Sequence, residues 1–205
     1  ELQVTYLSAL ADAAKQVTGM RFLNVAVPQG ASITNAVLEF FPSTILTADI
    51  DVDIVAEASD DSPPFTGVAA DFTGRAKTAA VNWEETDDWD EDLSVPLDGV
   101  PDVPHQTVDI SALIQAVVDR PGWCGNNAMA LYVRESAAMV NGPLKAASFD
   151  FDQSRAPILR IDYDQDNVPP SACIVTTLTN QVFTSSDDAE ETISNGSISL
   201  GGKRF

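Results

Sequence analysis

The chain has 205 residues, which is enough for one large β-domain or two small ones, and its hydrophobic share of 44% is ordinary for a globular protein. It carries 31 acidic residues against 11 basic ones, a formal net charge of −20. Nucleic-acid binding needs a surface of lysine and arginine, and anionic membranes repel such a charge, so neither partner is expected. No apolar run approaches the roughly 20 residues that span a bilayer, and no signal peptide is present, so an exported chain would be a mature or excised form.

The first half of the chain is predicted to form antiparallel strands. A turn at 28–31 joins two of them, because Pro28 presets φ and Gly30 accepts a positive φ. Residues 50–58 alternate almost strictly between apolar and polar side chains, which predicts a half-buried strand with one face in water. The predicted strands of this half are 2–7, 17–27, 33–41, 50–58 and 76–83.

One helix is predicted, at 109–120. Its apolar residues form a single stripe at helical spacing, Asp109 can cap the free N–H groups, and Pro121-Gly122 ends it. A helix in an otherwise β chain is expected to lie across one end of a sandwich. Before it come an irregular stretch at 59–75, an acidic run at 84–92 and a loop rich in Pro and Asp at 93–106.

The second half continues with short strands and ends in an acidic tail at 182–205. The tail has a cluster of carboxylates and then a strand at 192–200, with no later strand for it to join. Short strands separated by turn-forming residues predict an all-β, jelly-roll-like antiparallel β-sandwich. The predicted strands of this half are 127–135, 147–151, 156–163 and 174–183, with a linker at 167–172.

Four segments together carry a family resemblance that covers about 16–163. They are QVTGMRFLNVAVPQGASITNAVLEF, VAEASDD, VDISALIQAVVDRPGWCGNNAMALYV and SFDFDQSRAPILRIDY. The sequence resembles a bacterial extracellular β-sandwich module of the DNRLRE and carbohydrate-binding-module type, found in repeat-containing surface proteins. This resemblance implies a jelly-roll-like fold and a location outside the cell or on its surface.

The order of one segment departs from that family. There, a stretch like SSDDAEE followed by NGSISL opens the domain, whereas here it stands near the C-terminus. The chain is then one period of a tandem array, a subunit whose strands are donated to a neighbour, or a circular permutation that closes on itself.

We expect donation between copies. Residues 1–166 would form a sandwich that lacks its opening strands, and 167–205 would be a linker plus donor strands that pair with a neighbouring copy. Such head-to-tail contacts propagate into a filament instead of closing a dimer. The apolar residues expected at this subunit interface are Val182, Ile193, Ile198 and Leu200.

Calcium is the expected ligand of the acidic residues, because it takes six to eight oxygen ligands and tolerates irregular sites. No EF-hand loop occurs, so a site would be assembled from separate strands. The resemblance places the opening strand near the loop after residue 147 and implies a site of Asp150, Asp152, Asp187, Asp188 and Glu190. The alternative is an acidic surface that holds no metal.

The two cysteines, Cys124 and Cys173, both lie beside turn-forming residues. In a secreted chain they are expected to form a disulfide, which would stabilise the fold by roughly 4 kcal/mol in the chain-entropy model. The alternative is two buried free thiols.

No catalytic constellation is predicted. His105 is the single histidine and lies in a loop rich in proline, which does not suit a zinc site or a Ser–His–Asp triad. Trp83, Trp89 and Trp123 are candidates for a sugar-stacking platform; Trp89 is the best candidate for exposure, and Trp123 is expected to pack in the core.

The sequence therefore predicts a non-enzymatic, extracellular structural subunit that forms a filament or surface appendage with copies of itself. The alternative function is a carbohydrate-binding module of a larger surface protein, with polysaccharide as its partner. A hydrolase is a more distant third.

Overall fold

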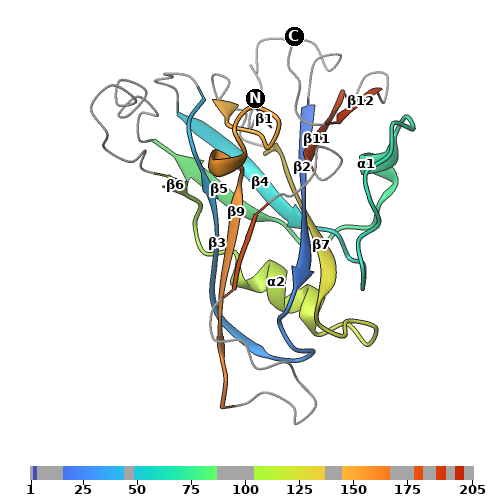
Figure 1. Cartoon of the computed structure of the whole chain (residues 1–205), viewed down its shortest axis with the longest axis vertical. Coiled ribbons are helices and arrows are strands. Elements are labelled where there is room, and N and C mark those ends of the chain that lie inside the picture. Colours follow the sequence, from blue (N-terminus) through green and yellow to red (C-terminus); the bar gives the residue numbers. More distant parts are fainter. Residues whose placement is uncertain are drawn as a thin grey trace.

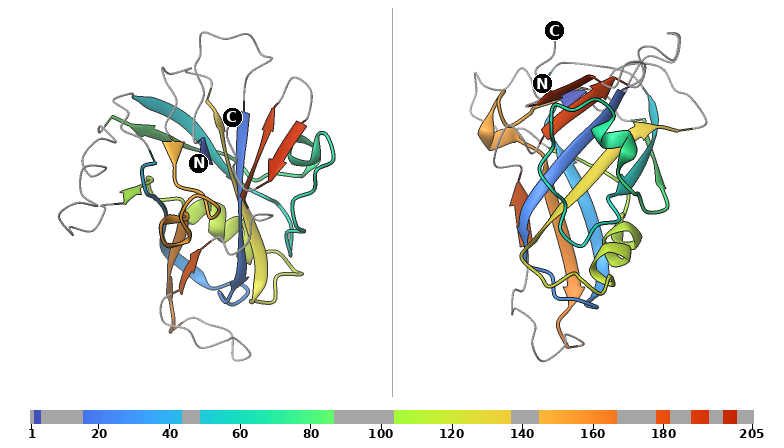
Figure 2. Two further views of the ribbon diagram at one scale, coloured as in Figure 1. Left: turned by 45° about the horizontal axis from the view of Figure 1, so that its top comes forward. Right: turned by 90° about the vertical axis from the view of Figure 1, so that its right-hand side faces the viewer.

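The structure of the chain is a computed structural model, and it describes residues 2–3, 16–43, 49–86, 104–136, 145–166, 178–181, 188–192 and 197–200. These residues form the predicted all-β sandwich of antiparallel sheets with a short helix (Figures 1 and 2). None of the helices in these ranges is long and apolar enough to cross a membrane.

The larger sheet has six strands within the described part of the chain. In order across the sheet they are β12 (Ser197–Leu200), β11 (Asp188–Thr192), β2 (Gln16–Val25), β7 (Asn127–Glu135), β4 (Ile50–Ala56) and β5 (Val81–Glu85). Every neighbouring pair is antiparallel.

The smaller sheet has four described strands, also antiparallel. In order they are β10 (Leu178–Gln181), β9 (Ile158–Asp164), β3 (Ser32–Phe40) and β6 (His105–Gln106). A further pair joins β1 (Leu2–Gln3) to β8 (Lys145–Ala146). The helices are α1 (Asp71–Gly74), α2 (Ser111–Val118) and the 3-10 turn η3 (Gln153–Arg155).

The main core fills the space between the two sheets with large apolar side chains. Trp83 of β5 stacks on Phe40 of β3, with ring centroids 5.8 Å apart, and so joins the two sheets. Trp123 is fully buried and its indole N–H donates to the carbonyl of Val27 at 2.7 Å, which confirms its expected place in the core. The apolar stripe of α2 faces the same core through Leu113, Ile114, Val117 and Val118.

Helix α2 and the residues before it close one edge of the smaller sheet. β6 pairs with β3 over only two positions. Beyond them, polar side chains bind the backbone edge of β3 in place of a strand. The backbone N–H groups of Leu38, Ala36 and Ile33 donate to Thr107 Oγ1, Asp109 Oδ1 and Gln115 Oε1 at 3.1, 3.0 and 2.9 Å. The open edge is thereby protected from pairing with another chain.

The C-terminal strands close the opposite edge of both sheets. β10 pairs with β9 at the edge of the smaller sheet. β11 pairs with β2 from Asp188 opposite Met20 to Thr192 opposite Gln16, and β12 completes a hairpin with β11. The hairpin lies beside β2, on the side of the molecule that carries α1 (Figures 1 and 2). A single segment, 178–200, therefore adds strands to each sheet.

Most of the predicted elements are confirmed with small shifts at their ends. The turn at Pro28–Ala31 is present, with Gly30 at a φ of 68°. The predicted helix at 109–120 begins two residues later, at Ser111, and Asp109 accepts a hydrogen bond from the N–H of Ser111 at 2.8 Å. The short strand expected at 147–151 lies instead at Lys145–Ala146.

Two predictions about individual strands need correction. The outer face of the predicted strand 50–58 is only partly in water: Asp51 and Asp53 are half-buried, as expected, whereas Val55 and Glu57 are buried under the loop that follows β4. The tail is not a single strand at 192–200, because the acidic stretch Asp188–Thr192 is itself a strand, β11. Acidic residues disfavour strands, but the unpaired edge of β2 supplies a hydrogen-bonded partner that outweighs this preference.

We expect Asp109→Ala to destabilise the fold by about 1–3 kcal/mol, because it leaves the N–H groups of Ala36 and Ser111 without their acceptor. Chemical denaturation of the variant and the parent chain measures this difference. Asp166→Ala, at an exposed position, is the matched control and should change the free energy of unfolding by less than about 0.5 kcal/mol. Equal effects of the two substitutions would contradict the edge-closing role of Asp109.

Candidate functional site

A long loop between β4 and β5 crosses the outer face of the larger sheet. It leaves the sheet after Glu57 and returns at Lys77, which pairs with Glu57 in an isolated bridge. We call residues 58–76 the outer-face loop. Ser62 ties it to the sheet: its N–H donates to the carbonyl of Ala128, and its carbonyl accepts from Arg21 Nε at 2.7 Å. The loop thus forms a third layer over β2 and β7.

A second, smaller apolar cluster lies under this loop. We call it the outer cluster, and Phe65 and Phe72 of the loop pack in it against Tyr132 of β7, with centroid distances of 5.9 and 5.3 Å. Gly19 of β2 lies beneath the pair, where a Cβ atom would come within 3.0 Å of both phenylalanine rings. Its members are Val17, Val55, Phe65, Phe72, Ala130 and Tyr132, with Ile198 of β12 partly buried against them.

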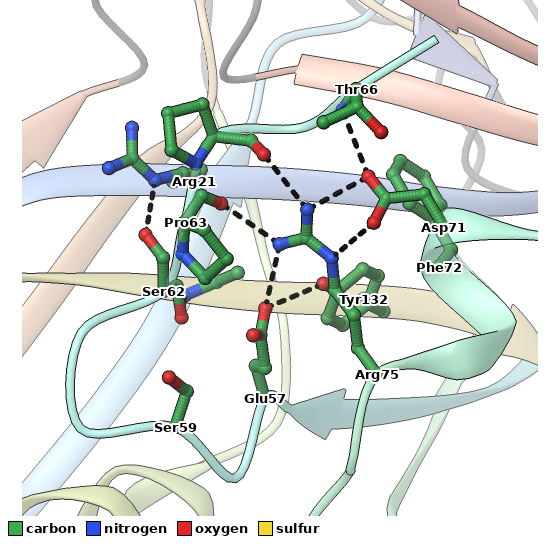
Figure 3. Close-up of polar contacts among 12 residues, drawn as sticks. Arg21, Glu57, Ser59, Ser62, Pro63, Thr66, Asp71, Phe72, Arg75 and Tyr132 are labelled. Carbon is green, nitrogen blue, oxygen red and sulfur yellow. Dashed lines mark hydrogen bonds and ion pairs between the residues drawn. The ribbon is translucent and has the colours of Figure 1, made fainter. Parts of the chain in front are cut away.

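Arg75 holds the outer-face loop in its closed form (Figure 3). Its Nε and one terminal nitrogen donate to the two carboxylate oxygens of Asp71 at 2.9 and 2.8 Å. The remaining N–H groups donate to the carbonyls of Pro63 and Pro64 and to Glu57 Oε2, at 2.9, 2.9 and 3.1 Å. These five bonds use every donor that a guanidinium has. The Arg75 side chain is only 9% exposed, so this saturation is what permits its burial.

Glu57 connects this arginine to the sheet. Its carboxylate is 6% exposed, and its Oε2 atom accepts from both Arg75 and the Tyr132 hydroxyl, the latter at 2.8 Å. Burial and the neighbouring Glu57 carboxylate raise the pKa of Tyr132 well above its usual value, so the hydroxyl stays protonated and remains a donor. Burial alone would lower the pKa of Arg75, but its bonds to Asp71 and Glu57 outweigh that effect and raise it.

A cleft of about 160 Å³ lies beside α1 on this face. Its apolar walls come from the outer cluster, and its polar lining comes from Thr73, Lys77 and Arg134. Lys77 Nζ lies 4.1 Å from the centre of the Tyr132 ring and donates to the carbonyls of Phe72 and Arg75. Arg134 is 45% exposed and lies 3.6 Å from Asp53. The cleft therefore combines an apolar floor with two cationic side chains, next to the cluster that contacts Ile198.

The charged groups around Arg75 on this face are saturated by hydrogen bonds within the protein. The guanidinium of Arg75 has no donor left for a substrate, and its carboxylate partners are each committed to hydrogen bonds within the cluster. The cleft stays open beside them, and the edge of β2 next to it is paired with β11. Both lie where the C-terminal hairpin meets the sheet.

The predicted calcium ligands fall on separate parts of the fold. Asp150 is exposed in the turn after β8, and Asp152 caps η3 through a bond from the Ser154 N–H at 2.9 Å. Asp188 and Glu190 lie on β11, and Asp187 is outside the described residues. Within the described ranges no group of three metal-ligating residues occurs, so calcium binding stays a prediction.

The predicted disulfide is not found at Cys124. Its thiol is free and exposed in the turn between α2 and β7, where its Sγ donates to the carbonyl of Gly122 at 3.5 Å. Cys173 lies outside the described residues.

The predicted interface residues are only partly described. Val182 and Ile193 lie outside the described ranges, and Leu200 ends β12 opposite Ala189. Ile198 packs on the outer cluster of its own chain. In the single chain the C-terminal strands therefore lie on their own sheets, as the self-closing alternative requires, and pairing with a neighbouring copy stays a prediction.

The aromatic candidates for sugar stacking are mostly unavailable to a ligand. Trp83 and Trp123 are both buried in the core. Trp89 lies outside the described residues, so the carbohydrate alternative depends on that residue. His105 lies at the sheet edge with its Nδ1 atom 3.8 Å from Glu85.

Sequence reasoning missed the outer-face loop and its arginine. The segment Asp71–Arg75 did contain a signal, since an acid and a base four residues apart face each other on one turn of helix. Such pairs are common on surfaces, and nothing in the spacing shows that this one is buried.

Comparisons of the chain with protein-family models, curated proteins and solved structures found no match. The resemblance to DNRLRE and carbohydrate-binding modules is therefore untested by them, and any functional argument depends on the geometry of the chain itself.

We expect Arg75→Met to destabilise the chain by about 3–5 kcal/mol, because it leaves the Glu57 and Asp71 carboxylates buried without their cation. Thermal or urea unfolding measures the loss. Arg134→Met removes a half-exposed arginine from the same face and should cost less than about 1 kcal/mol. Similar losses for the two variants would show that Arg75 does not hold the loop.

The Asp71 carboxylate should make stability depend on pH. Burial alone would raise the pKa of Asp71, but hydrogen bonds from Arg75 and Thr66 outweigh it and hold the pKa below the ordinary value of 3.8. The stabilisation is then fully present at neutral pH and is lost as the pH falls below about 5 and through the lowered pKa. The stability difference between the parent and Asp71→Asn should accordingly be largest near pH 7 and shrink towards pH 2, as measured by urea unfolding across that range. A difference that stays constant or grows in acid would contradict this assignment.

Proposed function

We propose that this chain is a non-enzymatic structural subunit of an extracellular assembly, in which segment 178–200 of one copy completes the sheets of the next. The proposal is carried by one observation: a single C-terminal segment supplies the edge strands of both sheets. Without that segment, β9 and β2 would each present a row of unpaired backbone groups.

The contacts that the segment makes do not depend on which copy supplies it. The β11–β2 ladder, the β10–β9 ladder and the packing of Ile198 on the outer cluster are the same whether the strands come from the same chain or from a neighbour. Exchange of an identical element between copies is a low-cost route to assembly, and a head-to-tail exchange extends without closing. The protein concentration and the geometry of the linker then determine how often the segment pairs with its own chain and how often it pairs with a neighbouring chain.

The linker length supports exchange. Eleven residues, 167–177, separate the described end of the body from β10. Eleven residues can span up to about 36–40 Å when extended, which is enough to reach an adjacent molecule as well as the chain's own edge.

An engineered disulfide distinguishes the two arrangements. Gln16 of β2 and Thr192 of β11 are register partners, so cysteines at both positions lie at a Cα separation suited to a disulfide. The experiment uses Gln16→Cys and Thr192→Cys in a chain whose Cys124 and Cys173 are replaced by serine. We expect covalent ladders of several subunits on a non-reducing gel of the assembled material, with filaments in electron micrographs.

The matched control places cysteines at Ser32 and Asp164, register partners of β3 and β9 within the body of one chain. That pair should give only monomers on the non-reducing gel. If the Gln16–Thr192 pair also gives only monomers at high protein concentration, the strands belong to their own chain and the proposed exchange is wrong.

A further inference from the structure

We propose that the outer-face loop is the receptor wall for the C-terminal hairpin and that Ile198 is the residue by which the hairpin is recognised. This inference rests on the proposed function for its partner, a hairpin of a second copy, but the surface and the anchor can be tested in any chain that folds.

The hairpin has two kinds of attachment to the rest of the molecule. The first is the main-chain ladder between β11 and β2, which almost any strand could form because backbone groups carry no sequence information. The second is the packing of Ile198 on the outer cluster. Since β12 is separated from β2 by β11, this contact reaches past the ladder and depends on a particular side chain. The second attachment therefore contributes selectivity for this hairpin that the ladder does not.

The surface that receives Ile198 is built without the hairpin. Phe65 and Phe72 are brought over the sheet by the outer-face loop, whose closed form depends on Arg75, and they rest on the bare backbone of Gly19. All of these residues lie between positions 19 and 75, in the body of the chain. Because no hairpin residue takes part in these contacts, we expect the wall to form before a partner docks, which would lower the entropy lost on docking.

Charge favours the same partner. The cleft that shares its walls with the outer cluster is lined by Lys77 and Arg134, in a chain whose formal net charge is −20. The strand that docks beside it, β11, has three acidic residues, of which one, Glu191, is the register partner of a cleft residue, Val17. An acidic residue at that position suits the cationic lining of the cleft, and a basic one would be less favourable.

Hydrogen exchange in the full chain tests the anchor. Ile198→Ala should raise the exchange rates of the amides in Asp188–Thr192 by about tenfold, while Ile198→Val should leave them within about threefold of the parent. Val68→Ala removes an apolar side chain that is 67% exposed on the same loop and should leave these rates unchanged. If Ile198→Ala and Val68→Ala behave alike, Ile198 is not the anchor.

A second variant tests the wall. Arg75→Lys loses the paired hydrogen bonds to Asp71 and should loosen the outer-face loop. We expect faster exchange in both the loop and β11, with the central amides of β7 still protected as evidence of a folded body. Faster exchange in the loop but not in β11 would overturn the role of the wall.

The hydrogen-exchange results and the disulfide result test different claims, so each claim can be wrong while the other is right. If Ile198→Ala loosens β11 while the Gln16–Thr192 disulfide gives only monomers, the receptor surface is right and it serves the chain's own hairpin. If the disulfide gives ladders while Ile198→Ala has no effect, copies exchange strands but Ile198 does not select them.

Discussion

The structure depends on one constraint: backbone groups at the edge of a sheet must find hydrogen-bond partners or remain open to other chains. The sandwich satisfies this constraint in a different way at each of its two sides. At β3, the partners are the side chains of Thr107, Asp109 and Gln115 around a helix. At β2 and β9, the partners are the strands of the C-terminal segment. Both closures join residues far apart in the sequence, but the first uses residues within the body of the sandwich, whereas the second uses a segment attached through a linker.

The outer-face loop satisfies a second constraint: carboxylates that are buried in this acidic chain need a cationic partner. Two carboxylates, Glu57 and Asp71, are nearly excluded from water, which would be unfavourable for either alone. Arg75 compensates for both, and the Tyr132 hydroxyl supplies a further bond to Glu57. The result is a rigid layer of loop on a sheet that would otherwise expose Tyr132 and Val55. The residue types of this cluster are also common in active sites, but here their hydrogen bonds join groups within the protein.

Much of the sandwich could be predicted from the sequence, because alternation of side chains reports strands that have one buried face. β4 was predicted in this way, β2, β3, β7 and β9 as short strands between turn-forming residues, and α2 by its apolar stripe and Asp109. The outer face of β4 could not be predicted, because the cover over Val55 comes from a loop without periodicity. β11 could not be predicted either, since its acidic residues are held in a strand by the edge of β2 and not by their own preference.

Less of the candidate site than of the fold could be predicted from the sequence. Ile198 was singled out as an apolar contact, but the surface that it meets was not, because Phe65, Phe72 and Arg75 lie in a stretch that has no regular pattern. Gly19 gave no sign of its role, since only the structure shows two aromatic rings where its side chain would be. The acidic residues predicted to bind calcium include Asp152, and its role in capping a 3-10 turn could not be predicted from the sequence.

The pairing of β2 with β11 also delays the completion of the larger sheet during protein synthesis. Met20 and its partner Asp188 are 168 positions apart, so a ribosome that adds about 5–20 residues per second makes β11 roughly 8–34 s after β2. During that interval the nascent sandwich has to keep its unfinished side from meeting another nascent chain. Contacts of such long range also form slowly once the chain is complete. Crowding of nascent chains on polysomes would then affect how often a strand pairs with its own molecule first.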